Sequence, residues 1–244
     1  MMKIFDVNLA TGRWPFRDLP LEKLEDLKVK LTVSGISGGL VRSLEAPFSM
    51  NIYEANEKLL KNCQNFPEFT VAPAVRPDFG LWRDIDAKAV VLYPNYHQYS
   101  LLSDECVEMV RTLLAKNIVP VIPVREEDER GQHPLCKVSP VPVEEINALA
   151  AIFPDKPFVA LNCYSGEFAA LTSGNIYADF AFADGFPALA GALKNFPASR
   201  LLFGSHAPFF CISSELSKLQ YEGLNDADIS EIVYNNAERI FNGQ

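Results

Sequence analysis

Polar side chains follow two apolar runs that lie at opposite ends of the sequence. The run at Lys3–Asp6 leads to Asn8, and the run at Arg200–Phe203 leads to His206. Each run is typical of a buried strand that delivers a polar group at its carboxyl end. A histidine near a carboxylate could act as a general acid or base, because its ordinary pKa lies near neutral. We therefore predict that Asp6, Asn8 and His206 form one catalytic group, provided that the two strands meet.

Six further apolar runs lie between these two, and amphipathic helical patterns separate them. The runs are Gly39–Arg42, Thr70–Val75, Ala87–Tyr93, Ile118–Val124, Pro157–Leu161 and Ile176–Phe180. The helical faces include Leu24, Leu27 and Leu31; Cys106, Val110 and Leu113; Val143, Ile146 and Leu149; Phe186, Leu189 and Leu193; and Ile229, Ile232, Val233, Ala237 and Ile240. Strands that alternate with helices predict a parallel sheet with the helices outside.

We therefore predict an α/β fold, a single and somewhat distorted (β/α)8 barrel over residues 1–244, with an open doubly wound sheet as the alternative. A closed barrel of about 250 residues suits this length, and it makes the first and last strands neighbours. Pro73, Pro120 and Pro123 fall inside predicted strands, and proline cannot donate to a sheet ladder. These strands are accordingly expected to be short or irregular.

The other predicted strands also end in polar residues, which would gather at the same mouth of the barrel. We predict that a set of them binds substrate, namely Arg13, Arg42, Arg76, Tyr93, His97, Arg125, His133 and Asn162. Arginine forks suit carboxylate or phosphate groups. The loop Thr11–Arg17 would place Trp14 and Phe16 at the mouth, either as pocket walls or as a plug of core.

Composition limits the partners. The net charge is −9 and no basic run occurs, so nucleic acid is not expected as a partner. The apolar runs are too short to span a membrane, and no apolar signal region precedes Asp6. The five cysteines are scattered and form no C-x-x-C pair, which favours a reducing cytoplasm over a disulfide framework or a structural zinc site. A small anionic molecule is the predicted partner.

The sequence resembles the amidohydrolase-related (amidohydrolase 2) family of metal-dependent hydrolases, which includes aminocarboxymuconate-semialdehyde decarboxylase-like enzymes and sugar-lactone hydrolases. Four stretches carry the resemblance: Ile4–Asn8, Ala89–Pro94 with Tyr99, Leu201–Pro208 and Asn235–Phe241. The first corresponds to the family's D-x-H-x-H strand and the third to its closing G-S-D-x-P. The resemblance implies a distorted (β/α)8 barrel, and a homodimer is possible because related barrels often pair.

The metal ligands of that family are largely replaced. Asn8 and Ala10 stand where the first strand supplies two histidines, and His206 stands where the final aspartate binds metal. Arg125 and Asn162 correspond to histidine tips. Zinc needs three or four well-placed ligands, and an arginine would repel a cation. We therefore predict that no zinc is tightly bound, with Asp6, Asn8 and His206 as a weak divalent-metal site at most.

Three functions remain open. The first is a hydrolase, metal-independent or weakly metal-dependent, that acts on a small carboxylated or sugar-acid (lactone) substrate, with a decarboxylase-like lyase as its variant; His206 would be the acid–base group, and Asp6 would orient it. The second is a non-catalytic barrel that binds a small acid, which a fully packed His206 would favour. The third is a new metal site built from Glu127, Asp128, His133 and His206.

Overall fold

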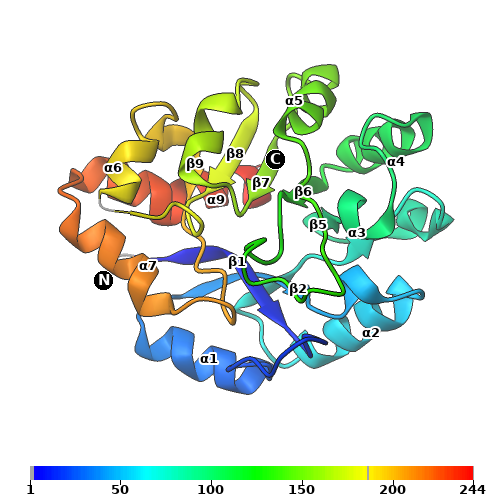
Figure 1. Ribbon diagram of the computed structural model, residues 1–244, viewed down its shortest axis with the longest axis horizontal. Coiled ribbons are helices and arrows are strands. Elements are labelled where there is room, and N and C mark those ends of the chain that lie inside the picture. Colours follow the sequence, from blue (N-terminus) through cyan, green and yellow to red (C-terminus); the bar gives the residue numbers. More distant parts are fainter. Residues whose placement is uncertain (1–2, 186, 244) are drawn as a thin grey trace.

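The computed structural model describes residues 3–185 and 187–243. Within these residues, nine parallel strands form the barrel and helices surround it (Figure 1). The strands are β1 (Phe5–Thr11), β2 (Gly38–Ser43), β3 (Phe69–Val71), β4 (Ala74–Val75), β5 (Ala89–Leu92), β6 (Val119–Pro123), β7 (Phe158–Leu161), β8 (Ile176–Asp179) and β9 (Leu201–Leu202). All eight predicted runs are strands, and β3 and β4 are two pieces of the third.

The sheet closes into a barrel. Strands β1 to β3 pair in order, and β4 to β9 pair in order. The Ala72 amide bonds to the Val41 carbonyl and the Val91 amide to the Pro73 carbonyl, which connects the two groups. The other seam runs between β1 and the segment after β9, where the Val7 amide donates to Phe203 and the Ala10 amide to Ala207. The predicted closed barrel is thus confirmed, and the open sheet is excluded.

The prolines affect the two predicted strands differently. Pro73 interrupts the third strand, as predicted, and the Asn56 side chain bonds to both the amide and the carbonyl of Ala74 beside the break. Strand β6, however, is regular through Pro120 and Pro123. It pairs with β5 up to Val121 and with β7 only from Val121 onward. An amide at Pro120 would face β7, and an amide at Pro123 would face β5. In both cases the pairing with that neighbouring strand does not reach the proline, so no hydrogen bond of the sheet is lost.

The helices are α1 (Leu24–Val33), α2 (Ile52–Cys63), α3 (Pro94–His97), α4 (Asp104–Ala115), α5 (Val143–Ile152), α6 (Ala188–Ala192), α7 (Ile212–Tyr221), α8 (Asp226–Ser230) and α9 (Asn236–Asn242). A π-helical turn, Glu231–Asn235, joins α8 to α9. Side-chain caps begin α2, α4 and α8, where Asn51, Ser103 and Asn225 accept bonds from backbone amides. Phe186, predicted on the face that became α6, lies outside the described residues. None of the described helices is both long enough and apolar enough to cross a membrane.

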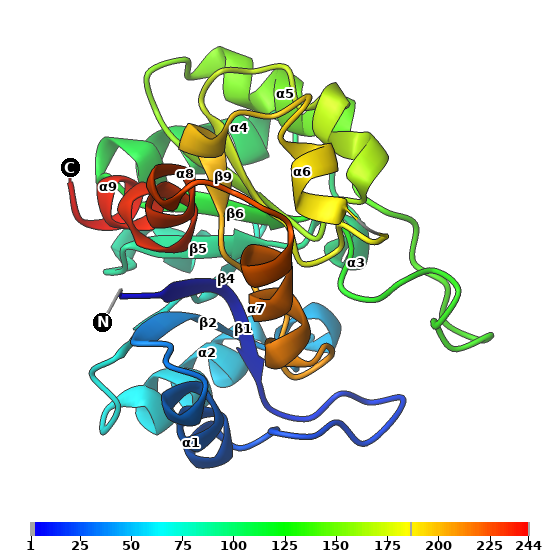
Figure 2. The ribbon, with the colours of Figure 1, turned by 90° about the vertical axis from the view of Figure 1, so that its left-hand side faces the viewer.

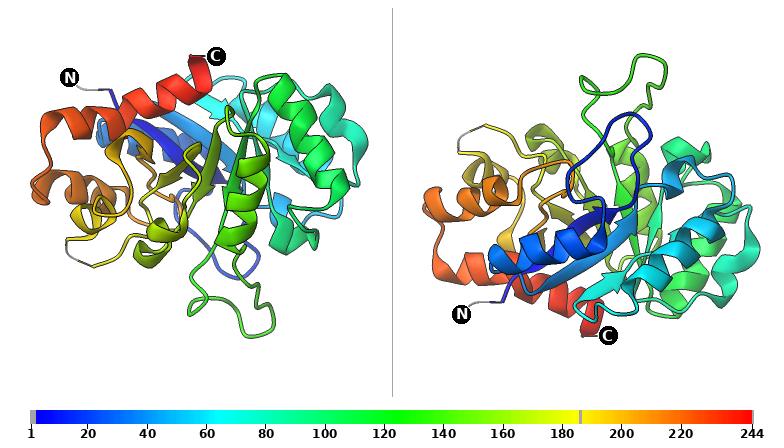
Figure 3. Two further views of the ribbon diagram at one scale, coloured as in Figure 1. Left: turned by 90° about the horizontal axis from the view of Figure 1, so that it is seen from above. Right: turned by 90° about the horizontal axis from the view of Figure 1, so that it is seen from below.

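The two ends of the barrel differ. Apolar side chains from the strands, such as Val7, Val121 and Leu202, fill the interior together with Ile240 and Phe241 of α9. Figures 2 and 3 show α9 at the amino end of the strands, and two long loops, 12–23 and 124–142, that project from the opposite end. The carboxyl ends of the strands therefore open under these two loops, where TIM barrels place their sites.

Candidate functional site

Asn8 is the centre of a buried polar network at the carboxyl end of the barrel. Its Nδ2 donates to Asn162 Oδ1 at 2.6 Å and to Asp179 Oδ2 at 2.7 Å, while its Oδ1 accepts from Arg42 Nη1 at 2.8 Å. Asn8 lies within β1 and Arg42 near the end of β2, while Asn162 directly follows β7 and Asp179 ends β8. All four side chains are buried. The amide of Asn8 is therefore fully engaged by the protein itself.

Arg42 forms a buried ion pair with Glu126, which directly follows Arg125 beyond β6. Its Nε and Nη2 donate to the two carboxylate oxygens of Glu126 at 3.2 and 2.8 Å. Both side chains are at most 3% exposed. Burial raises the pKa of Glu126 and of Asp179, and the Arg42 guanidinium works against that rise. Arg42 thus supplies the cation of this centre.

Asp6 lies in the same region and joins the first and last strands of the barrel. Its Oδ1 accepts the amides of Asn8 and Ser205, both at 3.0 Å. Among the described residues, its Oδ2 has no hydrogen-bond partner. Burial raises the pKa of Asp6 to about 6. Gly204, which precedes Ser205, permits this close packing, because a Cβ atom at residue 204 would stand 2.4 Å from an Asp179 oxygen.

His206 lies beside the network but is enclosed. Its Nε2 is 3.0 Å from the Glu126 carbonyl oxygen and its Nδ1 is 3.4 Å from Asn8 Oδ1. Both oxygens only accept, and we assign the proton of the neutral ring to Nε2 because its contact is the shorter one. Its ring stacks on Phe209 at 4.8 Å, and Phe182 and Phe210 cover its other sides. The side chain is 1% exposed, and burial holds its pKa well below the ordinary value. A neutral, packed imidazole without an open face is poorly placed to reach a substrate.

Arg125 is paired in a separate cluster. Its Nη1 donates to Glu167 Oε2 at 2.8 Å and to the Asn162 carbonyl at 2.6 Å, and its guanidinium lies 3.8 Å from the centre of the Tyr164 ring. The side chain is 2% exposed. Arg125 therefore supports the β7 end rather than presenting a free cation.

The two long loops plug the mouth above the network. Phe16 stacks on His133 at 5.6 Å, and Arg17 pairs with Glu127 at 2.9 Å, so that loop 12–23 is tied to loop 124–142. Trp14 is 2% exposed and packs against Phe209. The plug interpretation of these aromatics is thus correct. Arg13 lines a separate cavity of about 320 Å³ on the outer side of β1 and β2.

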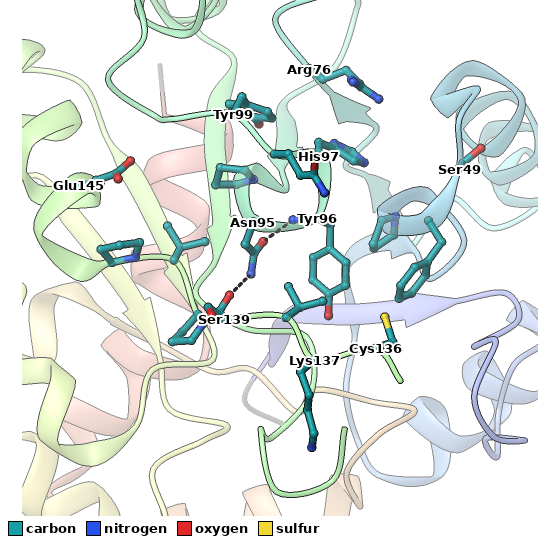
Figure 4. Close-up of a pocket in the computed structure, with 18 of the residues that line it drawn as sticks. Ser49, Arg76, Asn95, Tyr96, His97, Tyr99, Cys136, Lys137, Ser139 and Glu145 are labelled. Atoms are coloured by element: carbon teal, nitrogen blue, oxygen red, sulfur yellow. Dashed lines mark hydrogen bonds between the residues drawn. The ribbon is translucent and has the colours of Figure 1, made fainter. Parts of the chain in front are cut away.

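A larger cavity, of about 930 Å³, opens to one side of the plug (Figure 4). It is bounded by three segments, 47–50, 94–99 and 135–142, together with Arg76 and Glu145. Asn95 Nδ2 donates to the Ser139 carbonyl at 3.0 Å and so connects two of these segments. The volume suits a small-molecule ligand. Arg76 and His97, both predicted from the sequence as substrate-binding residues, are among the side chains that line it.

Polar atoms without partners gather along this cavity. Among the described residues, the buried atoms His97 Nδ1 and Tyr99 Oη belong to residues that line the cavity and have no hydrogen-bond partner. Tyr93 Oη has none either, but Tyr93 does not line the cavity, and its phenol interacts electrostatically with Arg42 and Glu126 of the buried network. His97 Nε2 lies 3.1 Å from the Ala46 carbonyl, and burial lowers the pKa of His97, so Nδ1 carries a lone pair. Unsatisfied buried polar groups are rare and point to an ordered water or a ligand group nearby.

The structure therefore divides the predicted site residues. Six of them form or adjoin the buried network: Asp6, Asn8, Arg42, Arg125, Asn162 and His206. Arg76 and His97 line the mouth cavity, whereas Tyr93 is buried and its phenol interacts with Arg42 and Glu126 of the network. Arg13 and His133 lie elsewhere, in the outer cavity and in the plug. The sequence interpretation missed Glu126 and Glu167 as partners, although Glu126 stands at a strand tip directly after Arg125, which was a usable signal.

The donor set does not fit a divalent metal. Asn8 Oδ1 already receives the Arg42 guanidinium, and a neighbouring fixed cation repels a metal ion. Asp6 Oδ2 is one free oxygen, whereas a metal site needs several converging ligands. Within residues 3–185 and 187–243, no three His, Cys, Asp or Glu side chains are arranged to hold a metal. This also contradicts the alternative site, because Glu127 pairs with Arg17, Asp128 with Arg130, and His133 stacks on Phe16.

Solved structures share this fold over nearly the whole chain. An amidohydrolase 2 from Bifidobacterium longum subsp. infantis has a TM-score of 0.69 at 15% identity and covers 99% of both chains. The 2,6-dihydroxybenzoate decarboxylase from Rhizobium has a TM-score of 0.71 at 14% identity over 98% of both chains. A dihydroxybenzoic acid decarboxylase from Polaromonas sp., with bound manganese and 2-nitroresorcinol, has a TM-score of 0.75 at 13% identity over 99% of this chain and 97% of that one.

These likenesses define the class of fold. The chain has the TIM-barrel fold of the amidohydrolase 2 structures, as the sequence resemblance predicted. No protein-family model and no curated protein matches the sequence. At these identities the likeness shows the fold, and the activity must be argued from the side chains of this chain.

The raised pKa of Asp6 predicts a specific dependence of stability on pH. Between the ordinary pKa of 3.8 and the folded value of about 6, the unfolded chain has lost the proton that the folded chain keeps. Stability from this group therefore falls as pH rises through that window, by about 3 kcal/mol in all. Asp6→Asn keeps an oxygen for the two amides but cannot titrate. We expect the unfolding free energy of wild type, measured with urea, to fall relative to that of Asp6→Asn between pH 4 and 7. Equal pH slopes of the unfolding free energy for the two proteins would refute this prediction.

Proposed function

We propose that this protein binds a small aromatic carboxylic acid in the mouth cavity and that Arg76 pairs with the carboxylate. One observation carries the proposal: of the four arginines predicted to bind an anion, Arg76 alone lines this cavity. Arg42 and Arg125 are buried against carboxylates, and Arg13 lines the outer cavity. A guanidinium at the rim of a cavity of about 930 Å³ is suited to a carboxylate.

The walls of the cavity support an aromatic ligand. Phe48 and Tyr96 both line it, and their rings meet edge to face at 5.2 Å. Aromatic faces of this kind pack well against a further ring. Among the structures with the same fold, two are named as decarboxylases of dihydroxybenzoic acids, which are small aromatic acids. That agreement supports the ligand class by analogy of fold.

The buried centre supports binding without a divalent metal. Arg42 holds the position between Asn8 and Glu126, so the donors that converge there are already satisfied. His206, whose full packing favours the binding function over an acid–base role, is closed off by three phenylalanines. We therefore expect the affinity for the acid to be the same with manganese and with a chelator.

A metal-independent lyase or hydrolase is the second candidate, and His97 is the residue that favours it. His97 is the histidine that lines the cavity, and its unprotonated Nδ1 has no partner among the described residues. A neutral imidazole can accept a proton from a substrate. Carbon dioxide release from a panel of hydroxybenzoic acids, and hydrolysis of a panel of lactones, would separate this candidate from pure binding.

Arg76→Gln should abolish most of the acid binding. A hydrogen bond to a charged group contributes about 1.5–3 kcal/mol, which corresponds to roughly a ten- to hundredfold loss of affinity. Calorimetric titration with benzoate measures the change, and benzamide, a neutral isostere, should bind weakly to both proteins. Arg130→Gln is the matched control, because Arg130 also pairs with an aspartate two residues away but does not line the cavity. Equal benzoate affinity for wild type and Arg76→Gln would overturn the proposal.

A further inference from the structure

Arg76 holds a carboxylate of its own chain in the geometry that a ligand would adopt. Its Nε donates to Asp78 Oδ1 and its Nη2 to Asp78 Oδ2, both at 2.7 Å. Two parallel bonds of this kind are the bidentate arrangement by which arginine recognises any carboxylate. The Arg76 side chain is 17% exposed and lies over the Phe79 ring, whereas the Asp78 side chain is 58% exposed. The guanidinium is thus held in place while its partner faces solvent.

The other two strand-tip arginines are held differently. Glu126, the partner of Arg42, is 1% exposed and reaches it from the other side of the barrel. Glu167, the partner of Arg125, is 25% exposed and also accepts the Tyr164 amide. Displacing either would leave a buried or bonded charge without its partner, which is costly. Asp78 has no hydrogen bond or ion pair other than the one to Arg76 among the described residues, so it can move into water.

We propose that Asp78 is a built-in competitor for the ligand carboxylate. It occupies the position at Arg76 that the acid takes, so that binding exchanges one carboxylate for another. This inference rests on the proposed function and adds a residue that lowers the affinity of every carboxylate ligand, so that only acids with further contacts bind measurably. An acid that offers nothing besides its carboxylate gains little from the exchange. An acid whose ring reaches Phe48 and Tyr96 gains additional contacts and is selected.

Removing the competitor should therefore strengthen binding. Exposed ion pairs contribute little, so we expect Asp78→Asn to bind benzoate roughly two- to fivefold more tightly than wild type. Asp78→Ala, which removes the side chain entirely, should show the same gain. Asp128→Asn is the matched control, because it breaks the similar pair with Arg130 outside the cavity and should leave benzoate affinity unchanged. The gain should vanish in Arg76→Gln/Asp78→Asn.

Acetate provides a second probe of the exchange. Displacing Asp78 costs every carboxylate the same free energy, so acetate affinity should rise in Asp78→Asn by the same factor as benzoate affinity, and the ratio of the two affinities should not change. Urea unfolding confirms that each variant is folded. Benzoate binding to wild type with no gain in Asp78→Asn and Asp78→Ala would overturn this inference and leave the proposed function in place. No benzoate binding to wild type or to either Asp78 variant would overturn both.

Discussion

Arg42→Met should cost this protein about 3–5 kcal/mol of unfolding free energy. The substitution removes one partner of a buried ion pair and leaves the Glu126 carboxylate without its cation, which is the expensive way to break such a pair. It also takes a hydrogen bond from Asn8 Oδ1, so the loss spreads to the contacts with Asn162 and Asp179. Urea denaturation at pH 7 measures the change.

Two further variants test the physical reason. Arg42→Lys should recover little, because an ammonium cannot make the two parallel bonds that the guanidinium makes with Glu126. The double variant Arg42→Met/Glu126→Leu removes both charges and should recover much of the lost stability, since apolar replacement of a buried pair is often tolerated. If Arg42→Met lost less than about 1 kcal/mol, the buried pair would not be the centre of this barrel mouth.

His206→Ala should also destabilise the fold, by about 2–4 kcal/mol. Removing the imidazole leaves a cavity among Phe182, Phe209 and Phe210 and takes the donor from the Glu126 carbonyl. The φ of +53° at this position adds to the cost, because alanine is strained there. If His206 were the acid–base group, as predicted from the sequence, His206→Asn would instead abolish turnover without unfolding the protein.

The same urea measurement, repeated on His206→Asn, separates the two interpretations. Asparagine tolerates the left-handed backbone but is too small to fill the aromatic cage, so we expect it to lie between wild type and His206→Ala in stability. Benzoate affinity should stay within about twofold of wild type in both variants when measured below their unfolding transitions, since His206 does not line the mouth cavity. A His206→Ala protein as stable as wild type would show that the imidazole is free to act on a ligand.

The sequence resemblance sets Asn8 at a position where the amidohydrolase 2 family has a metal-binding histidine. In this chain Asn8 bonds to Arg42, Asn162 and Asp179, which belong to the ends of three different strands. Unpaired carboxylates in the interior would be costly. The Arg42 guanidinium compensates two of them, Glu126 and Asp179, and this gives a physical account of how a barrel of this fold can remain stable without a metal at its centre.

The order of the strands and the closure of the barrel could be predicted from the sequence, and so could the strand tips that carry polar residues. Continuous apolar runs and their turn signals are local, and parallel pairing follows from their alternation with helices. The interruption of the third strand at Pro73 could likewise be predicted, because a missing amide is a property of one residue. Pro120 and Pro123 do not interrupt β6, because the effect of a proline also depends on where the neighbouring strands begin and end.

Which tips serve a ligand was decided by the tertiary structure. Arg42, Arg76 and Arg125 look alike in the sequence, each following an apolar run. They differ because Glu126 and Glu167 are buried or bonded against two of them, while Arg76 lines a cavity and pairs with the exposed Asp78. His206 was predicted from the sequence to be a catalytic group, but in the structure three phenylalanines enclose its ring. Burial and partner choice depend on residues far apart in the chain, so side-chain types at strand ends show where polar groups gather, and packing determines which of them stay available.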